Sequence, residues 1–185
     1  MKEQNKNSKG SSTGNTKKST QKKTLLKEMM RVMLKAIIIV GVAYFMFTKI
    51  YVFHKSSGMM APSIKAGDIV MGFTLDKKVK ARDVVIYVND EGENEYRVIA
   101  VEGDEIDIRD NTLYINGHAQ AEDYVYNQET SAWSDGVRFP LTVGKDEVFL
   151  LADKREEARD SRVFGCVKID DLKAKVVTIV RKDII

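Results

Sequence analysis

Residues 55–65, "KSSGMMAPSIK", gather side-chain types that nucleophilic catalysis uses. The serines offer hydroxyl groups and the two flanking lysines offer amines. In one class of hydrolase, a serine hydroxyl is the nucleophile and a lysine amine is the general base. The centre of the segment is Met59, however, and a thioether has no proton to lose. Lys55 and Lys65 stay charged when they are exposed, and a charged amine cannot accept a proton. The segment therefore contains the residue types for this chemistry in an arrangement that does not complete it.

Metal and thiol chemistry have even less support in the sequence. The chain has one cysteine, Cys166, and two histidines, His54 and His118. These three residues do not have the spacing of a metal site, and a single cysteine cannot form an intramolecular disulfide. Cys166 lies in "VFGCVKI", where it is typical of a small buried apolar residue. We therefore expect no metal and no other cofactor.

The charge of the chain is unevenly distributed. Residues 1–35 hold ten Lys or Arg and two Glu, whereas residues 36–185 hold 20 basic and 25 acidic residues. Because the positive charge belongs to the N-terminal segment alone, we do not expect nucleic acid binding. Residues 1–24 have Met1 as their single large apolar side chain. Such a composition cannot offset the entropy of ordering, so residues 1–30 are predicted to form a disordered basic tail.

Residues 31–53 are predicted to form a transmembrane helix. Positions 32–53 are almost all apolar, and about 20 such residues span a bilayer. A buried core helix and a cleavable signal peptide are the alternatives, but the long basic tail and the lack of a small-residue cleavage site favour a retained span. The positive-inside rule then predicts a single-pass cell-membrane protein with a cytoplasmic N-terminus and an extracellular C-terminal domain.

Residues 54–185 have the pattern of a mainly β domain. Short runs rich in β-branched and aromatic residues are separated by Gly, Asp, Asn and Lys. The predicted strands are 68–73, 83–88, 95–101, 104–109, 112–116, 146–152 and 173–181. Asn116 and Gly117 predict a tight hairpin turn. Strict alternation would place Tyr96, Val98 and Ala100 on one face of their strand. Residues 122–140 are expected to form a surface loop.

Several motifs, in the order in which they occur along the chain, resemble those of type I signal peptidases (peptidase S26). These are membrane-anchored serine proteases that cleave signal peptides. "SGMMAPS" is similar to the family's S-G-S-M-x-P-T box, and "YRVIAVEGD" to its K-R-V-I-x-x-x-G-D box. "LYINGH" resembles the hairpin that follows, and "ADKREEARDSR" the box G-D-N-R-x-x-S-x-D-S-R. The resemblance implies a signal-peptidase-like β-rich ectodomain after one N-terminal transmembrane helix.

The same resemblance implies that the catalytic positions are replaced. The family uses a serine nucleophile and a neutral lysine base, and their positions hold Met59 and Tyr96 here. The serine that helps to orient the lysine is Ala158. A phenol with a pKa near 10 is a poor base at neutral pH. Ser57, which the resemblance assigns to an oxyanion hole, lies about 6.6 Å from Met59 along an extended segment. No catalytic residue is therefore expected.

Other positions of the boxes are retained. The resemblance implies a charged cluster that holds a loop against the sheet, formed by Asp153, Arg155, Asp160 and Arg162. A peptide-shaped cleft is the candidate binding site, and its expected residues are Ser57, Met59, Met60, Pro62 and Tyr96. Met and Tyr side chains suit the binding of an extended partner, although they also suit simple filling of the replaced positions.

The functional hypothesis follows from the family. Degenerate members of this kind in Gram-positive bacteria are associated with pilus assembly by sortases, so the resemblance implies a non-catalytic chaperone or scaffold whose partners are pilin subunits, a sortase or both. The alternatives are an active signal peptidase with a relocated nucleophile and a regulator that binds signal peptides. A homo-oligomer through exposed strand edges is a further expectation.

Overall fold

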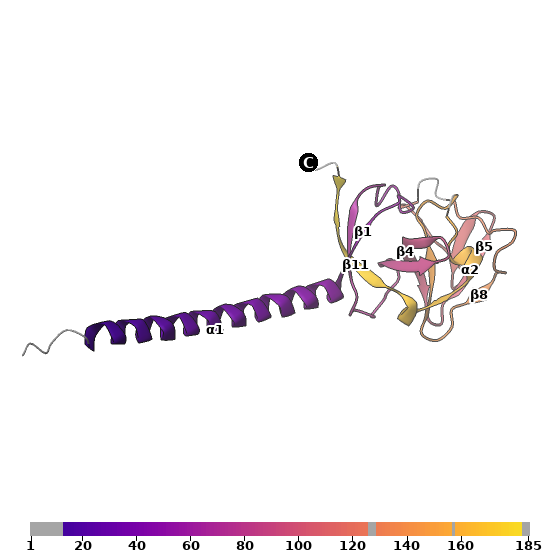
Figure 1. Ribbon diagram of the computed structural model, residues 1–185. Helices are drawn as coiled ribbons and strands as arrows, with labels where there is room; N and C mark the ends of the chain where they lie inside the picture. Colours follow the sequence, from indigo (N-terminus) through magenta and orange to yellow (C-terminus); the bar gives the residue numbers. More distant parts are fainter. Residues whose placement is uncertain (1–12, 126–128, 157, 183–185) are drawn as a thin grey trace, which may run out of the picture. The chain divides into compact units, whose positions relative to one another are not determined.

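The computed structural model describes residues 13–125, 129–156 and 158–182. It divides into a helical unit that ends at Phe47 and a β unit that begins at Thr48 (Figure 1). Helix α1 runs through Thr13–Ile50, and its segment Leu25–Ile50 is long and apolar enough to cross a membrane, with a mean hydropathy of 1.9. A signal sequence has the same properties, so a retained membrane span stays a proposal.

The helix differs from its predicted limits at both ends. It begins at Thr13, within the segment 1–30 that we expected to be disordered, and residues 1–12 lie outside the described part. Lys, Gln, Glu, Leu and Met are good helix formers, which explains the longer helix. It ends at Ile50 and not at residue 53, because "YVF" begins a strand. The backbone N–H of Thr74 donates to the Ile50 carbonyl at 2.9 Å and so caps the helix end.

The β unit contains two antiparallel sheets. The larger has the strand order β1-β2-β11-β3-β4-β9-β10 and the smaller the order β7-β6-β5-β8. The strands are β1 (Tyr51–Lys55), β2 (Ile69–Phe73), β3 (Val84–Asn89), β4 (Gly92–Val101), β5 (Glu105–Arg109), β6 (Thr112–Ile115), β7 (His118–Ala119), β8 (Leu141–Thr142), β9 (Glu147–Leu151), β10 (Val167–Lys168) and β11 (Ala174–Val180). The short helices are α2 (Ser161–Phe164) and the 3-10 helix η1 (Ile169–Asp171).

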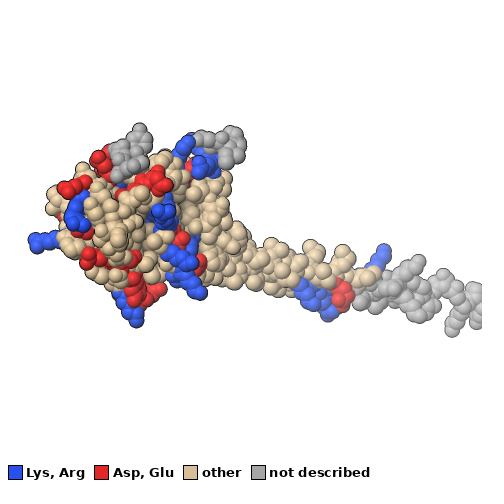
Figure 2. Space-filling model, turned by 180° about the vertical axis from the view of Figure 1, so that it is seen from behind, with Lys and Arg blue, Asp and Glu red and all other residues tan. Residues whose placement is uncertain are grey.

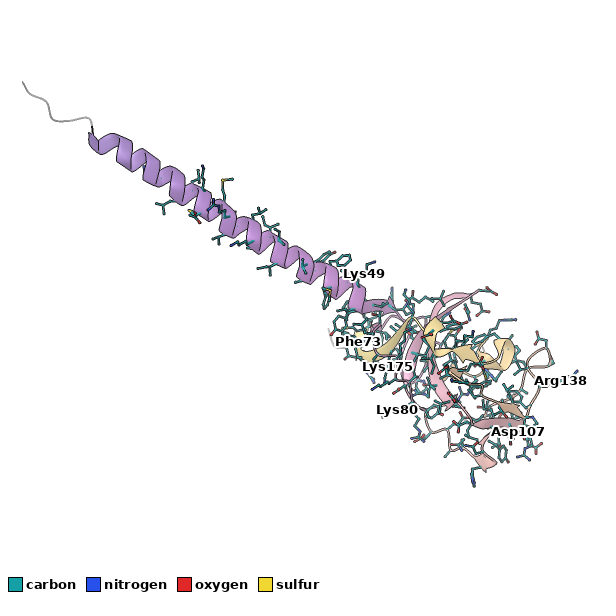
Figure 3. The ribbon with its side chains drawn as sticks, turned by 90° about the horizontal axis from the view of Figure 1, so that it is seen from below. Lys49, Phe73, Lys80, Asp107, Arg138 and Lys175 are labelled. Atoms are coloured by element: carbon teal, nitrogen blue, oxygen red, sulfur yellow. The ribbon has the colours of Figure 1, made fainter. Side chains whose placement is uncertain are left out.

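All seven predicted strands are confirmed, and the mainly β fold with them. Asn116 and Gly117 also adopt the predicted positive φ angles, 51° and 78°, in the turn between β6 and β7. Figure 3 shows Phe73 of β2 beside Lys175 of β11, its register partner, while Asp107 and Arg138 lie at the far side of the unit. On the face that Figure 2 shows, acidic and basic side chains are interspersed over the β unit.

The alternation predicted for β4 is wrong at one position. Val98 pairs with Leu150 and Ala100 pairs with Phe149, so Ile99 is an extra residue in a β-bulge. Tyr96 and Val98 therefore pack in one apolar cluster, whereas Ala100 packs in another with Ile99 and Phe149. We call the first the Tyr96 cluster. Its buried members are Val85, Tyr96, Val98, Val148, Leu150, Ala152, Ala158, Val167 and Leu172.

Candidate functional site

The segment after β1 is a closed loop. The Ser56 N–H donates to the Asp68 carbonyl and the Gly67 N–H to the Ser56 carbonyl, both at 2.9 Å, which joins the two ends of residues 56–68. Asp68 accepts from the N–H groups of Lys65 and Lys182 at 3.0 and 3.1 Å. These bonds lower the pKa of the Asp68 carboxyl, because they stabilise its charged form.

Gly58 allows the sharp turn before Met59. Its φ is +93°, and a Cβ at this position would lie 3.0 Å from the Ala66 Cβ and 3.1 Å from the Ala66 nitrogen. Only glycine adopts this conformation without strain and also fits against Ala66. The loop then docks on the segment after β9, since the Lys154 N–H donates to the Met59 carbonyl at 2.9 Å.

Tyr96 is completely buried in β4. Its hydroxyl accepts from Asn89 Nδ2 at 2.9 Å and donates to the Arg159 carbonyl at 3.4 Å, and its ring packs edge-on against Phe164. Burial raises the pKa of Tyr96 to about 12. At neutral pH the phenol is therefore protonated and cannot act as a general base.

The structure brings Met59, Tyr96 and Ala158 together. Tyr96 and Ala158 are both buried members of the Tyr96 cluster, and the half-buried side chain of Met59 packs against it. These residues come from three segments that are distant in the sequence. Where the resemblance places a serine, a lysine and a second serine, this chain has continuous apolar packing.

The serines of the loop are hydrogen-bonded, and the exposed Ser57 is not paired with a base. Ser57 is exposed, and its hydroxyl donates to Asn94 Oδ1 at 3.2 Å. An amide oxygen cannot take a proton from it at neutral pH. Ser56 is buried, donates to Glu95 Oε2 at 3.4 Å and accepts from the Gly58 N–H at 3.1 Å. Among the described residues, Ser57, the more accessible of the two, therefore has no base within hydrogen-bond distance, and Ser56 has its hydroxyl in the buried contact with Glu95.

The retained charged residues form buried pairs, and two of their partners were not predicted. Asp153 receives two hydrogen bonds from Arg97 of β4, at 2.8 and 2.6 Å, and one from Ser63 at 2.7 Å. Arg97 also stacks on the ring of Tyr124, at 4.4 Å from the centroid. Asp153 therefore connects the sheet to the loop that carries Met59.

Arg155 connects to the insertion that we expected to be a surface loop. It pairs with the buried Glu122 and donates to Thr130 Oγ1 at 2.9 Å. Thr130 in turn donates to Glu122. Residues 122–140 are thus anchored by a buried polar cluster at one end, although most of their described residues are at least partly exposed. Residues 126–128 lie outside the described part.

Asp160 and Arg162 hold the start of α2. Asp160 caps the helix by accepting from the Arg162 N–H at 3.1 Å, and it accepts from Arg162 Nε at 2.8 Å. Arg162 also donates to the carbonyls of Arg155 and Ser131, at 2.6 and 3.0 Å. The four residues therefore hold loops against the sheet through three ion pairs, two of which are linked by the bond from Arg162 to the Arg155 carbonyl.

The predicted cleft needs correction. Met60 and Tyr96 are fully buried, so neither side chain is accessible to a partner in this conformation. Pro62 lines a mainly apolar pocket of about 410 Å³. Its described lining residues are Ala61, Pro62, Lys65, Val125, Glu129, Asp153, Lys154, Arg155 and Glu156. Ser57 and Met59 remain at least partly accessible, outside this pocket.

Sequence analysis missed Arg97, Glu122 and Glu95. Arg97 lies within the second box, so its motif position was a usable signal. Glu122 and Glu95 gave none, because an acidic residue in a polar segment normally faces solvent. Among the described residues no group of His, Cys, Asp and Glu has the arrangement of a metal site. Burial raises the pKa of the half-buried Cys166 thiol, which disfavours a reactive thiolate.

The chain is similar to known signal peptidases. Residues 26–181 match the family "Signal peptidase, peptidase S26". The chain is 29% identical over 134 residues to signal peptidase IB of Staphylococcus aureus, covering 63% of this chain and 70% of that protein. It is also 29% identical over 138 residues to signal peptidase I of Bacillus licheniformis, covering 68% and 74%.

A solved structure shows a further similarity. The crystal structure of a signal peptidase I from Enterococcus faecalis aligns with a TM-score of 0.44 and 29% sequence identity. The alignment covers 55% of this chain and 97% of that one.

Proposed function

Because the chain belongs to the peptidase S26 signal peptidase family, we propose that it uses the scaffold of that family to bind a protein segment without cleaving it. The proposal is supported by the packing of Met59, Tyr96 and Ala158 in one apolar cluster. A thioether, a buried neutral phenol and a methyl group supply neither a nucleophile nor a base. The scaffold around them is held by the ion pairs of Asp153, Arg155 and Arg162.

We propose an extended segment as the bound partner. β1 is the end strand of the larger sheet, and residues 92–96 of β4 pair with β3 alone, since β9 pairs only with residues 97–101. Strand edges of this kind accept an extended peptide through backbone hydrogen bonds. By the family resemblance, the partner is a pilin subunit or its sortase. The protein then acts as a scaffold at the outer face of the membrane, anchored by α1.

The alternative function is signal-peptide cleavage with a relocated nucleophile. It is supported by the similarity to proteins named signal peptidases and by the exposed hydroxyl of Ser57. It requires a base for Ser57, whose hydroxyl is bound to Asn94. A third function, binding of signal peptides in competition with an active peptidase, uses the same surface and requires no chemistry.

One experiment separates these functions. The full-length protein in detergent is incubated with a signal-peptide-bearing precursor, with an active signal peptidase in parallel, and the products are identified by mass spectrometry. We expect no new N-terminus from this protein while the control cleaves. Cleavage that is lost in Ser57→Ala would contradict the proposal and support the relocated nucleophile.

Binding is then measured by site-specific crosslinking. A photocrosslinker at position 57, which is exposed, is expected to capture a pilin subunit or the sortase. Capture of signal peptides alone would favour the competitive regulator. The matched control carries the crosslinker at Arg138, which is exposed and distant from the loop in the sequence.

A further inference from the structure

Glu95 is a buried carboxylate between β4 and the β1 end of the loop. It is fully buried, and Ser56 donates to its Oε2 at 3.4 Å. His54 of β1 lies between two carboxylates, with Nε2 at 3.4 Å from Glu95 Oε1 and Nδ1 at 3.3 Å from Glu93 Oε1. The contacts between β1 and this part of β4 are thus made by side chains.

The negative charge of Glu95 is less well paired with cations than the charges of the neighbouring acidic residues. Glu93 also pairs with Lys173, and Glu91 pairs with Arg159 at 3.4 Å. Within the described part of the chain, Glu95 Oε1 and His54 Nε2 are buried atoms without a hydrogen-bond partner. Burial raises the pKa of the Glu95 carboxyl, and the opposing influence of His54 does not fully offset it. A buried carboxylate in this state is costly unless a cation pairs with it.

The position of Glu95 relates it to partner binding. It lies within residues 92–96, which have a neighbouring strand on the β3 side alone. It contacts His54 of β1, the end strand of the sheet, and Ser56 of the loop that follows β1. Glu95 is fully buried and in contact with His54 and Ser56, so an extended segment along this edge of β4 reaches it when the His54 side chain moves aside. Alternate side chains of an added strand point toward the sheet face on which Glu95 lies.

We propose that Glu95 recognises a lysine or arginine side chain of the extended segment that the protein binds, and that His54 occupies this site until the segment arrives. This inference rests on the proposed function. A lysine ammonium donates three hydrogen bonds, and a carboxylate beside it favours its charged form, so it satisfies the carboxylate more completely than an imidazole does. The acidic run Asp90, Glu91 and Glu93 beside the site adds attraction for a cationic segment.

The test uses two peptides that differ in charge alone. The capped peptide Thr-Val-Thr-Lys-Thr-Val-Thr is compared with its norleucine analogue by calorimetric titration of the full-length protein in detergent. We expect the lysine peptide to bind roughly tenfold more tightly, the gain of one charge-assisted hydrogen bond. Glu95→Gln, which keeps the side-chain shape, is expected to remove this difference. Glu93→Gln is the matched control on the same strand and is expected to keep most of it.

A second variant tests the role of His54. His54→Ala removes the side chain that occupies the site, so it is expected to strengthen binding of the lysine peptide and to leave the norleucine peptide nearly unchanged. Equal affinities of the two peptides for wild type, or a lysine preference that survives in Glu95→Gln, would overturn the inference. If both peptides bind equally, the proposed binding function stands without the cation site. If neither binds and position 57 captures no protein, both proposals fail.

Discussion

Two neighbouring regions of the β unit have changed to different degrees relative to the family motifs. The Tyr96 cluster contains Tyr96 and Ala158 and packs against Met59, and none of these three residues matches the catalytic pattern. The second region consists of the ion pairs Arg97–Asp153, Arg155–Glu122 and Arg162–Asp160. Its members in the third box keep the charges of that motif, only a few residues from Ala158.

The difference separates chemistry from architecture. A catalytic serine and lysine would cost stability, because a neutral lysine must be desolvated, and Met59, Tyr96 and Ala158 carry no such cost. A buried ion pair cannot lose one member in the same way, since the remaining charge would be buried without a partner. The comparison predicts that substitutions in the ion pairs destabilise the protein strongly, whereas substitutions at Met59, Tyr96 and Ala158 have smaller effects.

The largest effect is expected from Arg162→Ala. Asp160 is fully buried, and the substitution would leave its carboxylate without the guanidinium that lies 2.8 Å away. We expect a loss of about 3–5 kcal/mol in the free energy of unfolding. Urea denaturation of the full-length protein in detergent measures it.

Arg159→Ala is the control for this substitution. Arg159 is in the same segment, but its side chain is 50% exposed and its pair with Glu91 is long, at 3.4 Å. We expect a change within about 0.5 kcal/mol. Equal effects of the two substitutions would show that the buried pair does not hold the scaffold.

The two adjacent methionines give a second, sharper comparison. Met60 is fully buried in a separate cluster with Ile64, Val70 and Ile86, so Met60→Ala is expected to cost about 2–5 kcal/mol. Met59 is half-buried, so Met59→Ala is expected to cost about 1 kcal/mol. Thermal denaturation of both variants measures the difference. A larger loss at Met59 would show that this position is needed for the fold and was not simply replaced.

The third prediction concerns alkaline pH. Tyr96 has a pKa of about 12 in the folded protein, against an ordinary value of 10.0. Between these pH values the unfolded chain loses a proton that the folded chain retains, so the stability that is present below pH 10 is lost as the pH rises. We expect a loss on the order of 2 kcal/mol from this residue. Tyr87 and Tyr124 also have raised pKa values, so they add to the loss.

Tyr96→Phe isolates the contribution of this residue. The variant is expected to lose less stability than wild type over the same pH range, and its phenolate absorbance is expected to lack the last-titrating tyrosine. Identical pH profiles for the two proteins would contradict a buried, neutral Tyr96.

Local sequence signals were enough to predict most of the fold. Each of the seven strands is a short run of β-branched or aromatic residues, and Asn116-Gly117 has the one conformation that its turn requires. The segment "YVF" was misassigned, because apolar residues that extend a helix pattern are equally suited to a strand. Its pairing with β2 depends on residues about 20 positions away. The bulge at Ile99 likewise depends on β9 and leaves no mark in the sequence of β4.

The residues of the candidate site were predictable where a family motif identified their positions in the sequence. Met59, Tyr96 and Ala158 were identified from three boxes, and the structure places them in one cluster. Their burial was not predictable, and neither were the pairs of Asp153 with Arg97 and of Arg155 with Glu122. These partners are separated by 56 and 33 positions, and only the fold brings them together.

Tyr96→Phe at neutral pH is expected to have a much smaller effect than the loss of a buried ion pair. The substitution keeps the ring that packs at 6.1 Å from Phe164 and removes the hydroxyl that bonds Asn89 and the Arg159 carbonyl. Both partners lie near the surface, where water can replace the phenol, so we expect a loss of about 1 kcal/mol. Tyr44→Phe, at a residue that is 71% exposed, is the control and is expected to change nothing measurable in the same denaturation experiment. A side chain that merely fills space would contribute little through its hydroxyl. A loss as large as that of Arg162→Ala would therefore mean that the Tyr96 hydroxyl supports the scaffold as the ion pairs do.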